Sequence, residues 1–293
     1  MATRLFVLLA REAPVAVVFR RGPSKQVLLV RWNLRDDTFE AGQWFKGRIY
    51  EHRCDLSPRG DRLVYFAANW KKPFETWTAV SRPPYLTALA IWPKGDAWGG
   101  GGLFQDRDTL LLNHMAGQDF TDGPPPTALK VDKVADAGCG EDYPILFHRL
   151  TRDGWRFIQE LSRKPRKQPE IWWKACPKFA ARPGLRMCTD AIHEKNGPWY
   201  VRRFEIASPD GDAVDLGRAD WADWSSDGDL LLARAGKIHR LPRDATGADD
   251  PWSAARELVD LSSLSFEGRE APPEARTWNG PPPPGYPLLR SES

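Results

Sequence analysis

The sequence predicts an all-β protein assembled from a repeated unit of short strands. Three observations lead to this prediction. The chain of 293 residues contains 26 Pro and 24 Gly, which implies many turns and therefore many short elements. One pattern of turn followed by apolar strand recurs along the chain. No segment keeps the helical spacing of apolar residues for more than about two turns.

The pattern is clearest in "ADWADWSSDGDLLLARAGKIHRL", residues 219–241. Asp227 and Gly228 form a hairpin turn, because Asp bonds to its own backbone and Gly adopts positive φ at little cost. Residues 230–233 follow as an apolar strand, and residues 237–241 form another strand after a second turn. The continuous apolar run predicts a strand that is covered on both faces.

The same order of turn and apolar strand occurs in four earlier segments. The strands predicted there are residues 27–30, 63–67, 110–112 and 155–158. Successive turn centres are 38, 47, 47 and 74 residues apart, and they are Gly22, Gly60, Arg107, Gly154 and Gly228. A four-stranded propeller blade takes about 40 to 50 residues. The spacing therefore predicts a single β-propeller of five blades, or of six if a further blade lies between the last two centres.

Two segments, "LSPRGDRLVYFA" and "DWSSDGDLLLARAGKIHRL", resemble the TolB-type propeller repeat. In that repeat a Ser-Pro-Asp-Gly turn joins the first two strands of a blade. The resemblance implies the propeller architecture and no particular function. Ser225-Ser226 departs from it by lacking the proline, and the turn at residues 105–108 lacks the glycine, so the number of repeats stays open.

The propeller is expected to span residues 1–278. Because an open ring leaves exposed strand edges, we expect a strand near the N-terminus, such as residues 15–19, to pair with the last blade. Residues 279–293 form a proline-rich C-terminal tail whose polyproline II segment either lies on the domain or extends from it. The best candidate for a short helix is residues 252–261.

Composition and charge exclude several functional classes. The net charge of +3, from 42 Lys and Arg against 39 Asp and Glu, is too balanced to predict binding to nucleic acid or an anionic membrane. The apolar run of residues 5–10 is shorter than a signal peptide requires, and no run reaches the length of a membrane span. The four cysteines show no framework spacing. We therefore expect a cytoplasmic protein with reduced thiols and no membrane partner.

No catalytic, cofactor-binding or metal-binding motif stands out, so no catalytic residue, cofactor or metal is predicted. The isolated His and Cys residues lack the close ligand pairs of structural zinc sites, and we interpret them as core thiols and surface imidazoles; they are His52, Cys54, Cys176, Cys188 and His193. Residues 99–102, all glycine, precede a predicted strand instead of a helix. A phosphate loop leads into the N-terminus of a helix, so we interpret these glycines instead as a place where neighbouring backbone segments approach closely.

A basic stretch precedes two tryptophans and could in principle hold phosphates and stack on bases; it comprises Arg163, Lys164, Arg166, Lys167, Trp172 and Trp173. We favour the interpretation as a solvated loop followed by a buried strand, and nucleic acid is not an expected partner.

The main functional hypothesis is a non-catalytic scaffold that binds a protein or peptide. The segment "SRPPY" is stiffened by its prolines, and Arg and aromatic residues are typical interface anchors. We therefore predict a binding site at Arg82 and Tyr85, partly exposed beside a concavity, with Trp77 or Trp92 supporting them from below. In the structural alternative, Arg82 pairs with the carboxylate of a neighbouring blade and Tyr85 fills a gap.

The enzymatic alternative is a carbohydrate-active hydrolase. The segment "RWNLRDDTFE" supplies three carboxylates, Asp36, Asp37 and Glu40, and glycoside hydrolysis needs two carboxylates several ångströms apart across a pocket. Tryptophan faces would stack on the sugar rings.

Overall fold

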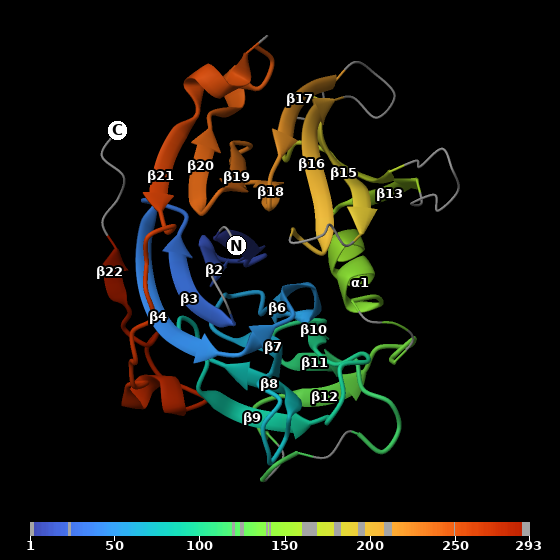
Figure 1. Ribbon diagram of the computed structural model, residues 1–293, viewed down its shortest axis with the longest axis vertical. Coiled ribbons are helices and arrows are strands. Elements are labelled where there is room, and N and C mark those ends of the chain that lie inside the picture. The colour runs from blue at the N-terminus through green and yellow to red at the C-terminus, as the bar shows by residue number, and fades with distance from the viewer. Residues whose placement is uncertain are drawn as a thin grey trace. The chain divides into compact units, whose positions relative to one another are not determined.

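The computed structural model describes residues 3–22, 25–118, 121–123, 126–138, 140, 142–159, 169–178, 183–192, 197–207, 213–248 and 250–288. Strands make up 45% of the chain and helices 9%, which confirms the all-β class. The strands form five sheets that follow one another along the chain (Figure 1).

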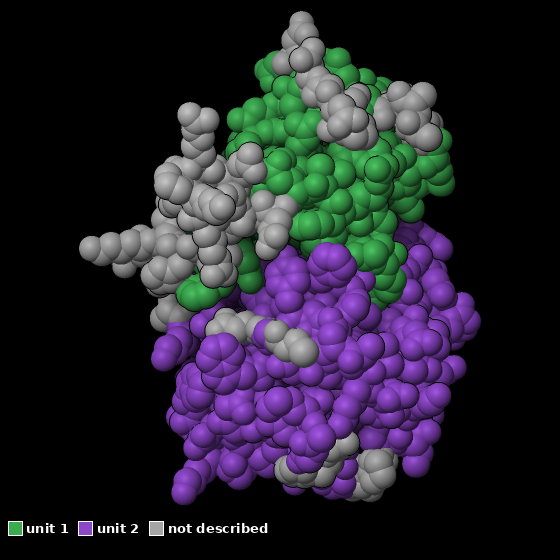
Figure 2. Space-filling model, turned by 90° about the vertical axis from the view of Figure 1, so that its right-hand side faces the viewer, with its two compact units in different colours: residues 1–6, 150–264, 289–293 green, residues 7–149, 265–288 purple. Residues whose placement is uncertain are grey.

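Contacts divide the chain into two compact units (Figure 2). Unit 1 comprises residues 1–6, 150–264 and 289–293, and unit 2 comprises residues 7–149 and 265–288. A division by contacts does not distinguish one propeller domain from two, so one domain over residues 1–278 followed by a tail stays a prediction. No sheet closes on itself within the described ranges, and the ring therefore stays a prediction.

The first sheet draws strands from both ends of the chain. Its order is β1-β2-β3-β4-β22, with β1 (Arg4–Leu9), β2 (Val15–Arg21), β3 (Gln26–Asn33), β4 (Thr38–Lys46) and β22 (Tyr286–Leu288). The strand predicted at residues 15–19 is therefore present, but its predicted pairing with the last blade is wrong. Both edges of β2 are already taken by β1 and β3, and the C-terminal strand β22 joins β4 instead.

Two further sheets complete unit 2. The second sheet contains β5 (Arg48–Ile49), β6 (Asp55–Leu56), β7 (Leu63–Ala68), β8 (Thr76–Ser81) and β9 (Ala88–Pro93). The third contains β10 (Gly102–Phe104), β11 (Thr109–Leu112) and β12 (Lys130–Lys133), the last of which runs parallel to β11. One core of this unit gathers side chains of consecutive sheets, among them Val64, Trp92, Phe104 and Leu110.

The last two sheets belong to unit 1. One has the order β13 (Arg156–Gln159), β14 (Glu170–Lys174), β15 (Gly184–Ile192), β16 (Tyr200–Ala207) and β17 (Ala213–Arg218). The other has the order β18 (Trp221–Trp224), β19 (Leu230–Arg234), β20 (Lys237–Leu241) and β21 (Arg256–Asp260). Their shared core contains Trp172, Phe204, Leu230 and Leu232.

The five strands predicted after turns are all present, as β3, β7, β11, β13 and β19. Four of the five turn centres lie between strands of one sheet. Gly154 does not, because the segment before it forms the helix α1 (Ile145–Arg152) instead of a strand. The helix buries Ile145, Leu146 and Arg149, whose three- and four-residue spacing suits one helical face.

The helix expected at residues 252–261 is not formed. Its first part is a 3-10 turn, η3 (Pro251–Ala254), and its second part is the edge strand β21, which pairs with β20. The apolar residues Leu258 and Val259 are buried there because the sheet supplies a face that local propensity does not anticipate. The other 3-10 turns are η1 (Glu51–Arg53), η2 (Arg243–Ala245) and η4 (Pro273–Arg276).

The glycine run enters β10 through a stretch of unusual backbone. Gly99, Gly100 and Gly101 have φ values of 68°, 85° and 81°, a region that favours glycine. A Cβ on Gly101 would lie 2.0 Å from the carbonyl oxygen of Arg53. The interpretation of the run as a site of close backbone approach is therefore confirmed.

Replacing Gly101 by Ala should destabilise the protein more than replacing Gly95. Both glycines have positive φ, of 81° and 86°, so both substitutions carry the left-handed strain of about 1 kcal/mol. No atom lies within 4 Å of a Cβ on Gly95, whereas a Cβ on Gly101 meets the Arg53 backbone. Chemical denaturation should show a loss of about 3 kcal/mol or more for Gly101→Ala. Equal losses for the two variants would contradict the account.

Candidate functional site

Arg82 and Tyr85 follow β8 and are buried, with exposed fractions of 4% and 2%. The prediction that they are partly exposed is therefore wrong. The side chain of Tyr85 packs against Ala271 and Ala275, in the segment that precedes the C-terminal tail. A later part of the chain, residues 271–284, covers both residues, and only its last portion, from residue 279, was predicted to be a tail.

The guanidinium of Arg82 binds backbone carbonyls of that later segment. It donates to the carbonyl oxygens of Glu274 at 2.7 Å and of Gly280 and Pro281 at 2.8 Å each. Two longer contacts, of 3.5 Å, reach the carbonyls of Thr277 and Asn279. Its acceptors are thus peptide oxygens and not the neighbouring carboxylate that the structural alternative expected. Burial lowers the pKa of Arg82, which the nearby Asp61 partly opposes.

Tyr85 extends the same contact surface. Its hydroxyl donates to the carbonyl oxygen of Pro284 at 2.8 Å, and burial raises its pKa. We call Arg82 and Tyr85 the cradle, and residues 279–288, which lie on it and end in β22, the strap. The first part of the proline-rich tail therefore lies on unit 2, and residues 289–293 are outside the described residues.

Trp77 and Trp92 do not support the cradle. Trp77 lies near the start of β8, paired with Pro93, whereas Arg82 follows the end of that strand. Five residues of strand separate them by about 16 Å. Trp92 is 1% exposed and belongs to the core of unit 2. The strand register therefore assigns both tryptophans to positions away from the predicted site.

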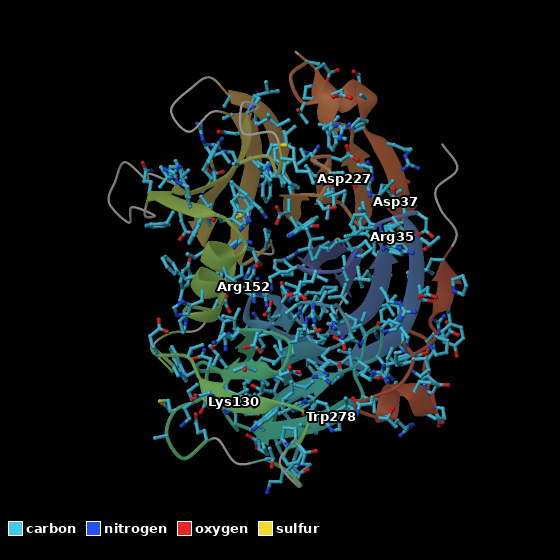
Figure 3. The ribbon with its side chains drawn as sticks, turned by 180° about the vertical axis from the view of Figure 1, so that it is seen from behind. Arg35, Asp37, Lys130, Arg152, Asp227 and Trp278 are labelled. Atoms are coloured by element: carbon cyan, nitrogen blue, oxygen red, sulfur yellow. The ribbon has the colours of Figure 1, made fainter. Side chains whose placement is uncertain are left out.

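The three carboxylates of the hydrolase hypothesis lie in the hairpin of β3 and β4, where Figure 3 labels Asp37. Asp36 accepts from the backbone and the hydroxyl of Thr38, and Asp37 accepts from the indole of Trp32 at 3.1 Å. Glu40 forms an ion pair with Arg31. Each carboxylate stabilises the hairpin, and these contacts supply no geometric argument for glycoside hydrolysis.

The three cysteines among the described residues, Cys54, Cys176 and Cys188, are buried. Burial raises the pKa of Cys54 and of Cys188, as expected for core thiols. His52 is buried, so its interpretation as a surface imidazole is wrong, and it lies 3.5 Å from a carboxylate oxygen of Asp142. No group of three potential ligands that could hold a metal ion occurs among the described residues. His193 and the basic residues Arg163, Lys164, Arg166 and Lys167 lie outside them.

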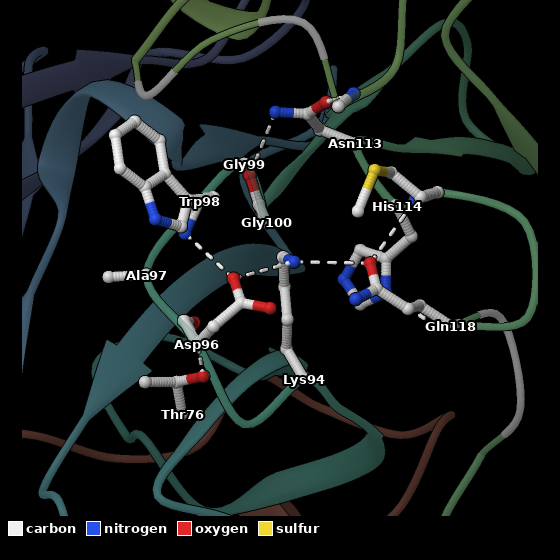
Figure 4. Close-up of polar contacts among 12 residues, drawn as sticks. Thr76, Lys94, Asp96, Ala97, Trp98, Gly99, Gly100, Asn113, His114 and Gln118 are labelled. Atoms are coloured by element: carbon white, nitrogen blue, oxygen red, sulfur yellow. Dashed lines mark hydrogen bonds and ion pairs between the residues drawn. The ribbon is translucent and has the colours of Figure 1, made fainter.

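A second polar site, which the sequence did not indicate, lies in two loops of unit 2 (Figure 4). The first loop, residues 94–101, joins β9 to β10, and the second, residues 113–118, follows β11. We call these two loops the Trp98 platform. Together with Thr78 of β8, their side chains form a connected set of hydrogen bonds that includes the backbone N–H of Trp98, whose indole is exposed.

Lys94 links the two loops. Its side chain is 0% exposed, and its ammonium donates to a carboxylate oxygen of Asp96 at 3.0 Å and to the amide oxygen of Gln118 at 3.1 Å. The same oxygen of Asp96 accepts from the backbone N–H of Trp98 at 2.8 Å. Asp96 thus fixes the start of the turn that presents Trp98 (Figure 4).

His114 extends the set into the interior, where it and Thr78 are fully buried. Its Nδ1 lies 2.6 Å from the carbonyl oxygen of Gln118, which can only accept, so Nδ1 carries a proton. Its Nε2 lies 2.8 Å from the hydroxyl of Thr78, which accepts from the N–H of Gly101 at 2.8 Å. The neutral imidazole satisfies this arrangement with the Thr78 hydroxyl donating to Nε2.

Arg53 and Asn113 form hydrogen bonds with the backbone of the loop that carries Trp98. Arg53 donates to the carbonyls of Ala97 at 2.7 Å and Gly99 at 2.5 Å. The N–H of Gly100 donates to the carbonyl of Asn113 at 2.8 Å. The loop that carries Trp98 is therefore fixed by contacts on both sides, although it has no regular secondary structure.

Two large apolar side chains on the platform face solvent. Trp98 is 66% exposed and Met115 is 46% exposed, while the backbone N–H and carbonyl of Met115 bond to Gln118. Sequence reasoning missed this site because no motif links residues 94–101 to residues 113–118. The one available signal was Trp98 itself, directly before a run of four glycines.

Comparisons with known proteins do not assign a family. No protein-family model and no curated protein matches the chain. Among solved structures, the chain is similar to an uncharacterized protein from Listeria monocytogenes EGD-e, with 11% sequence identity and a TM-score of 0.32 over 90% of this chain and 86% of that one. A TM-score this low does not establish a common fold.

None of the helices in the described ranges has the length and apolar character needed to cross a membrane.

Loss of Asp96 should cost more stability than loss of Lys94. In Asp96→Ala the buried ammonium of Lys94 loses its charged partner, which we expect to cost about 2 kcal/mol or more. In Lys94→Met the remaining carboxylate of Asp96 is 44% exposed and can be hydrated, so we expect about 1 kcal/mol or less. Chemical denaturation measures both, and the Lys94→Met, Asp96→Ala double variant should be more stable than Asp96→Ala. The reverse order would contradict the assignment of the ammonium as the buried charge.

Loss of Arg82 should lower the melting temperature more than loss of the Tyr85 hydroxyl. Arg82→Ala leaves three carbonyl oxygens within 2.8 Å without their donor, whereas Tyr85→Phe removes one hydrogen bond. A single neutral bond is worth about 1 kcal/mol, or roughly 2 to 4 °C in a protein of this size. We expect several degrees for Arg82→Ala in a thermal melt. An unchanged melting temperature for Arg82→Ala would mean that the strap does not depend on the cradle.

Proposed function

We propose that this protein is a non-catalytic, cytoplasmic scaffold that binds a protein or peptide partner through the Trp98 platform. The observation that supports the proposal most is a largely exposed indole on a loop fixed by several hydrogen bonds, of which those of Gly99 and Gly101 are buried. Tryptophan is enriched among residues that contribute most to binding at interfaces. Because the loop is already ordered, little conformational entropy is lost when a partner covers Trp98.

The polar set beneath Trp98 has the character of a support and not of a reaction centre. Lys94 is paired with Asp96, and His114 and Thr78 are fully buried. These groups stabilise the loops from the protein side, so the platform presents mainly Trp98 and Met115 to a partner. A protein segment with an apolar side chain flanked by polar groups would complement such a surface.

We also propose that the five sheets are the blades of a TolB-like propeller. Five consecutive sheets and the turn pattern, which recurs between strands at four of the five predicted centres, support this architecture. The first sheet combines β1 to β4 with β22, and strand pairing between the two ends of a chain is a means of closing a ring. The hydrolase alternative stays a prediction without a geometric argument, since Asp36, Asp37 and Glu40 have structural partners.

The test compares matched tryptophan variants in quantitative capture from native cell lysate. Trp98→Ala removes the proposed contact, and Trp199→Ala removes another exposed indole, 42% exposed, from unit 1. Wild type and Trp199→Ala should recover the same stoichiometric partner, and Trp98→Ala should lose at least tenfold in affinity for the purified partner, as expected for an interface residue worth more than about 1.4 kcal/mol.

Circular dichroism and thermal melts of both variants provide the control for folding. If Trp98→Ala folds normally and binds the purified partner as tightly as wild type, the proposed role of the platform is wrong. Equal losses in both tryptophan variants would also contradict a localised site.

A further inference from the structure

Most contacts that hold the strap on unit 2 are hydrogen bonds to its backbone, and most of its residues remain exposed. Seven of its ten residues are exposed, and Pro283 is its one buried residue. The guanidinium of Arg82 and the hydroxyl of Tyr85 bind its carbonyls, and the three residues of β22 pair with β4. Apart from the ring of Tyr286, over which the guanidinium of Arg269 lies at 4.1 Å, these contacts are made to backbone groups that any extended peptide possesses.

A proline-rich peptide is the ligand that this chemistry suits. Proline has no N–H, and in the polyproline II conformation its carbonyls have no internal partners, so they are available to external donors. Arginine presents several N–H groups in a planar fork and can serve more than one carbonyl at once. The two donors of the cradle reach Gly280, Pro281 and Pro284, and so span the four-proline segment.

The cradle has supports that do not involve the strap. The N–H of Tyr85 donates to the carbonyl of Arg82 at 3.0 Å, and the N–H of Gln43 donates to the carbonyl of Pro84 at 3.0 Å. The amide oxygen of Gln43 also accepts from the N–H of Leu86 at 3.0 Å. The loop of residues 82–86 is therefore anchored to β4, and departure of the strap would expose a formed site.

We propose that the cradle is a binding site for an extended, proline-rich segment of a partner protein, and that the strap is its resident intramolecular occupant. This site is separate from the Trp98 platform and does not depend on the function proposed for it. A tethered segment acts at an effective concentration on the order of 1 mM, so an external peptide gains access mainly when the strap is displaced. The poor burial of the strap favours such displacement.

Gly285 offers a way to displace the strap without altering the cradle. A Cβ at this position would lie 2.6 Å from the Cβ of Glu40 and 3.2 Å from the ring of Pro84. Gly285→Val in the full-length chain should therefore prevent docking of the strap while Arg82 and Tyr85 remain intact. Gly285→Ala is the milder variant if the valine impairs folding.

The experiment measures anisotropy of a labelled synthetic peptide, NGPPPPGYPL, which has the sequence of residues 279–288. The Gly285→Val chain should bind it at least tenfold more tightly than wild type. Adding Tyr85→Phe should weaken this binding about fivefold, as expected for one hydrogen bond, and adding Arg82→Lys should weaken it further. The matched peptide NGPPPPVYPL should not bind, because its valine meets the same obstruction.

Two results would overturn the proposal. The first is a folded Gly285→Val or Gly285→Ala chain that binds NGPPPPGYPL no better than wild type, or that binds both peptides equally. The second is a concentration-dependent dimer of the wild-type chain that the peptide dissociates, because the cradle would then serve exchange of the strap between copies of this chain.

Discussion

The buried guanidinium of Arg53 is the interaction on which the platform depends. Arg53 is 1% exposed, donates to Asp142 at 2.8 Å and to the carbonyls of Ala97 and Gly99, and lies over the rings of Tyr50 and Phe66. A buried cation is tolerated only where charge and hydrogen bonds compensate its lost hydration. The loop before β10 supplies two of those acceptors, so its conformation is coupled to the burial of Arg53.

That coupling explains why the run of glycines is needed. The backbone of Gly101 passes so close to the carbonyl of Arg53 that a side chain has no room, and three consecutive residues adopt positive φ. Because this backbone conformation is irregular, the N–H groups of Gly101 and Gly100 do not form the hydrogen bonds of a β-sheet. They donate instead to the hydroxyl of Thr78 and to the carbonyl of Asn113. The result is an irregular loop with fixed positions for Trp98 and for the polar groups beneath it.

The five strands β3, β7, β11, β13 and β19 could be predicted from the sequence because each follows a local turn signal, such as Asp227-Gly228 before β19. Most failures involve partners outside the local segment, and the helix α1 before Gly154 is the exception. β21 and β22 are strands because β20 and β4 offer open edges, and Arg82 is buried because residues 274–281 return to it. The Trp98 platform joins Lys94 to Gln118, which lie 24 positions apart, and no local pattern encodes that contact.

The cradle and the platform use the same physical device in different ways. In each, buried donors bind backbone carbonyls of an irregular segment: Arg82 for the strap, and Arg53 for the loop of Trp98. Arginine suits this task because one planar group serves several acceptors. In the platform the bonded glycines Gly99, Gly100 and Gly101 are buried, whereas seven of the ten residues of the strap are exposed.

The loop carrying Trp98 should be ordered before any partner binds, and amide hydrogen exchange of the free protein tests this most directly. The N–H groups of Gly100 and Gly101 bond to Asn113 and Thr78 at 2.8 Å each. Their exchange should be as slow as that of amides in β7 and β8, and Arg53→Met should accelerate it. Exchange of these two amides at the rate of an unstructured loop in the wild-type protein would contradict the account.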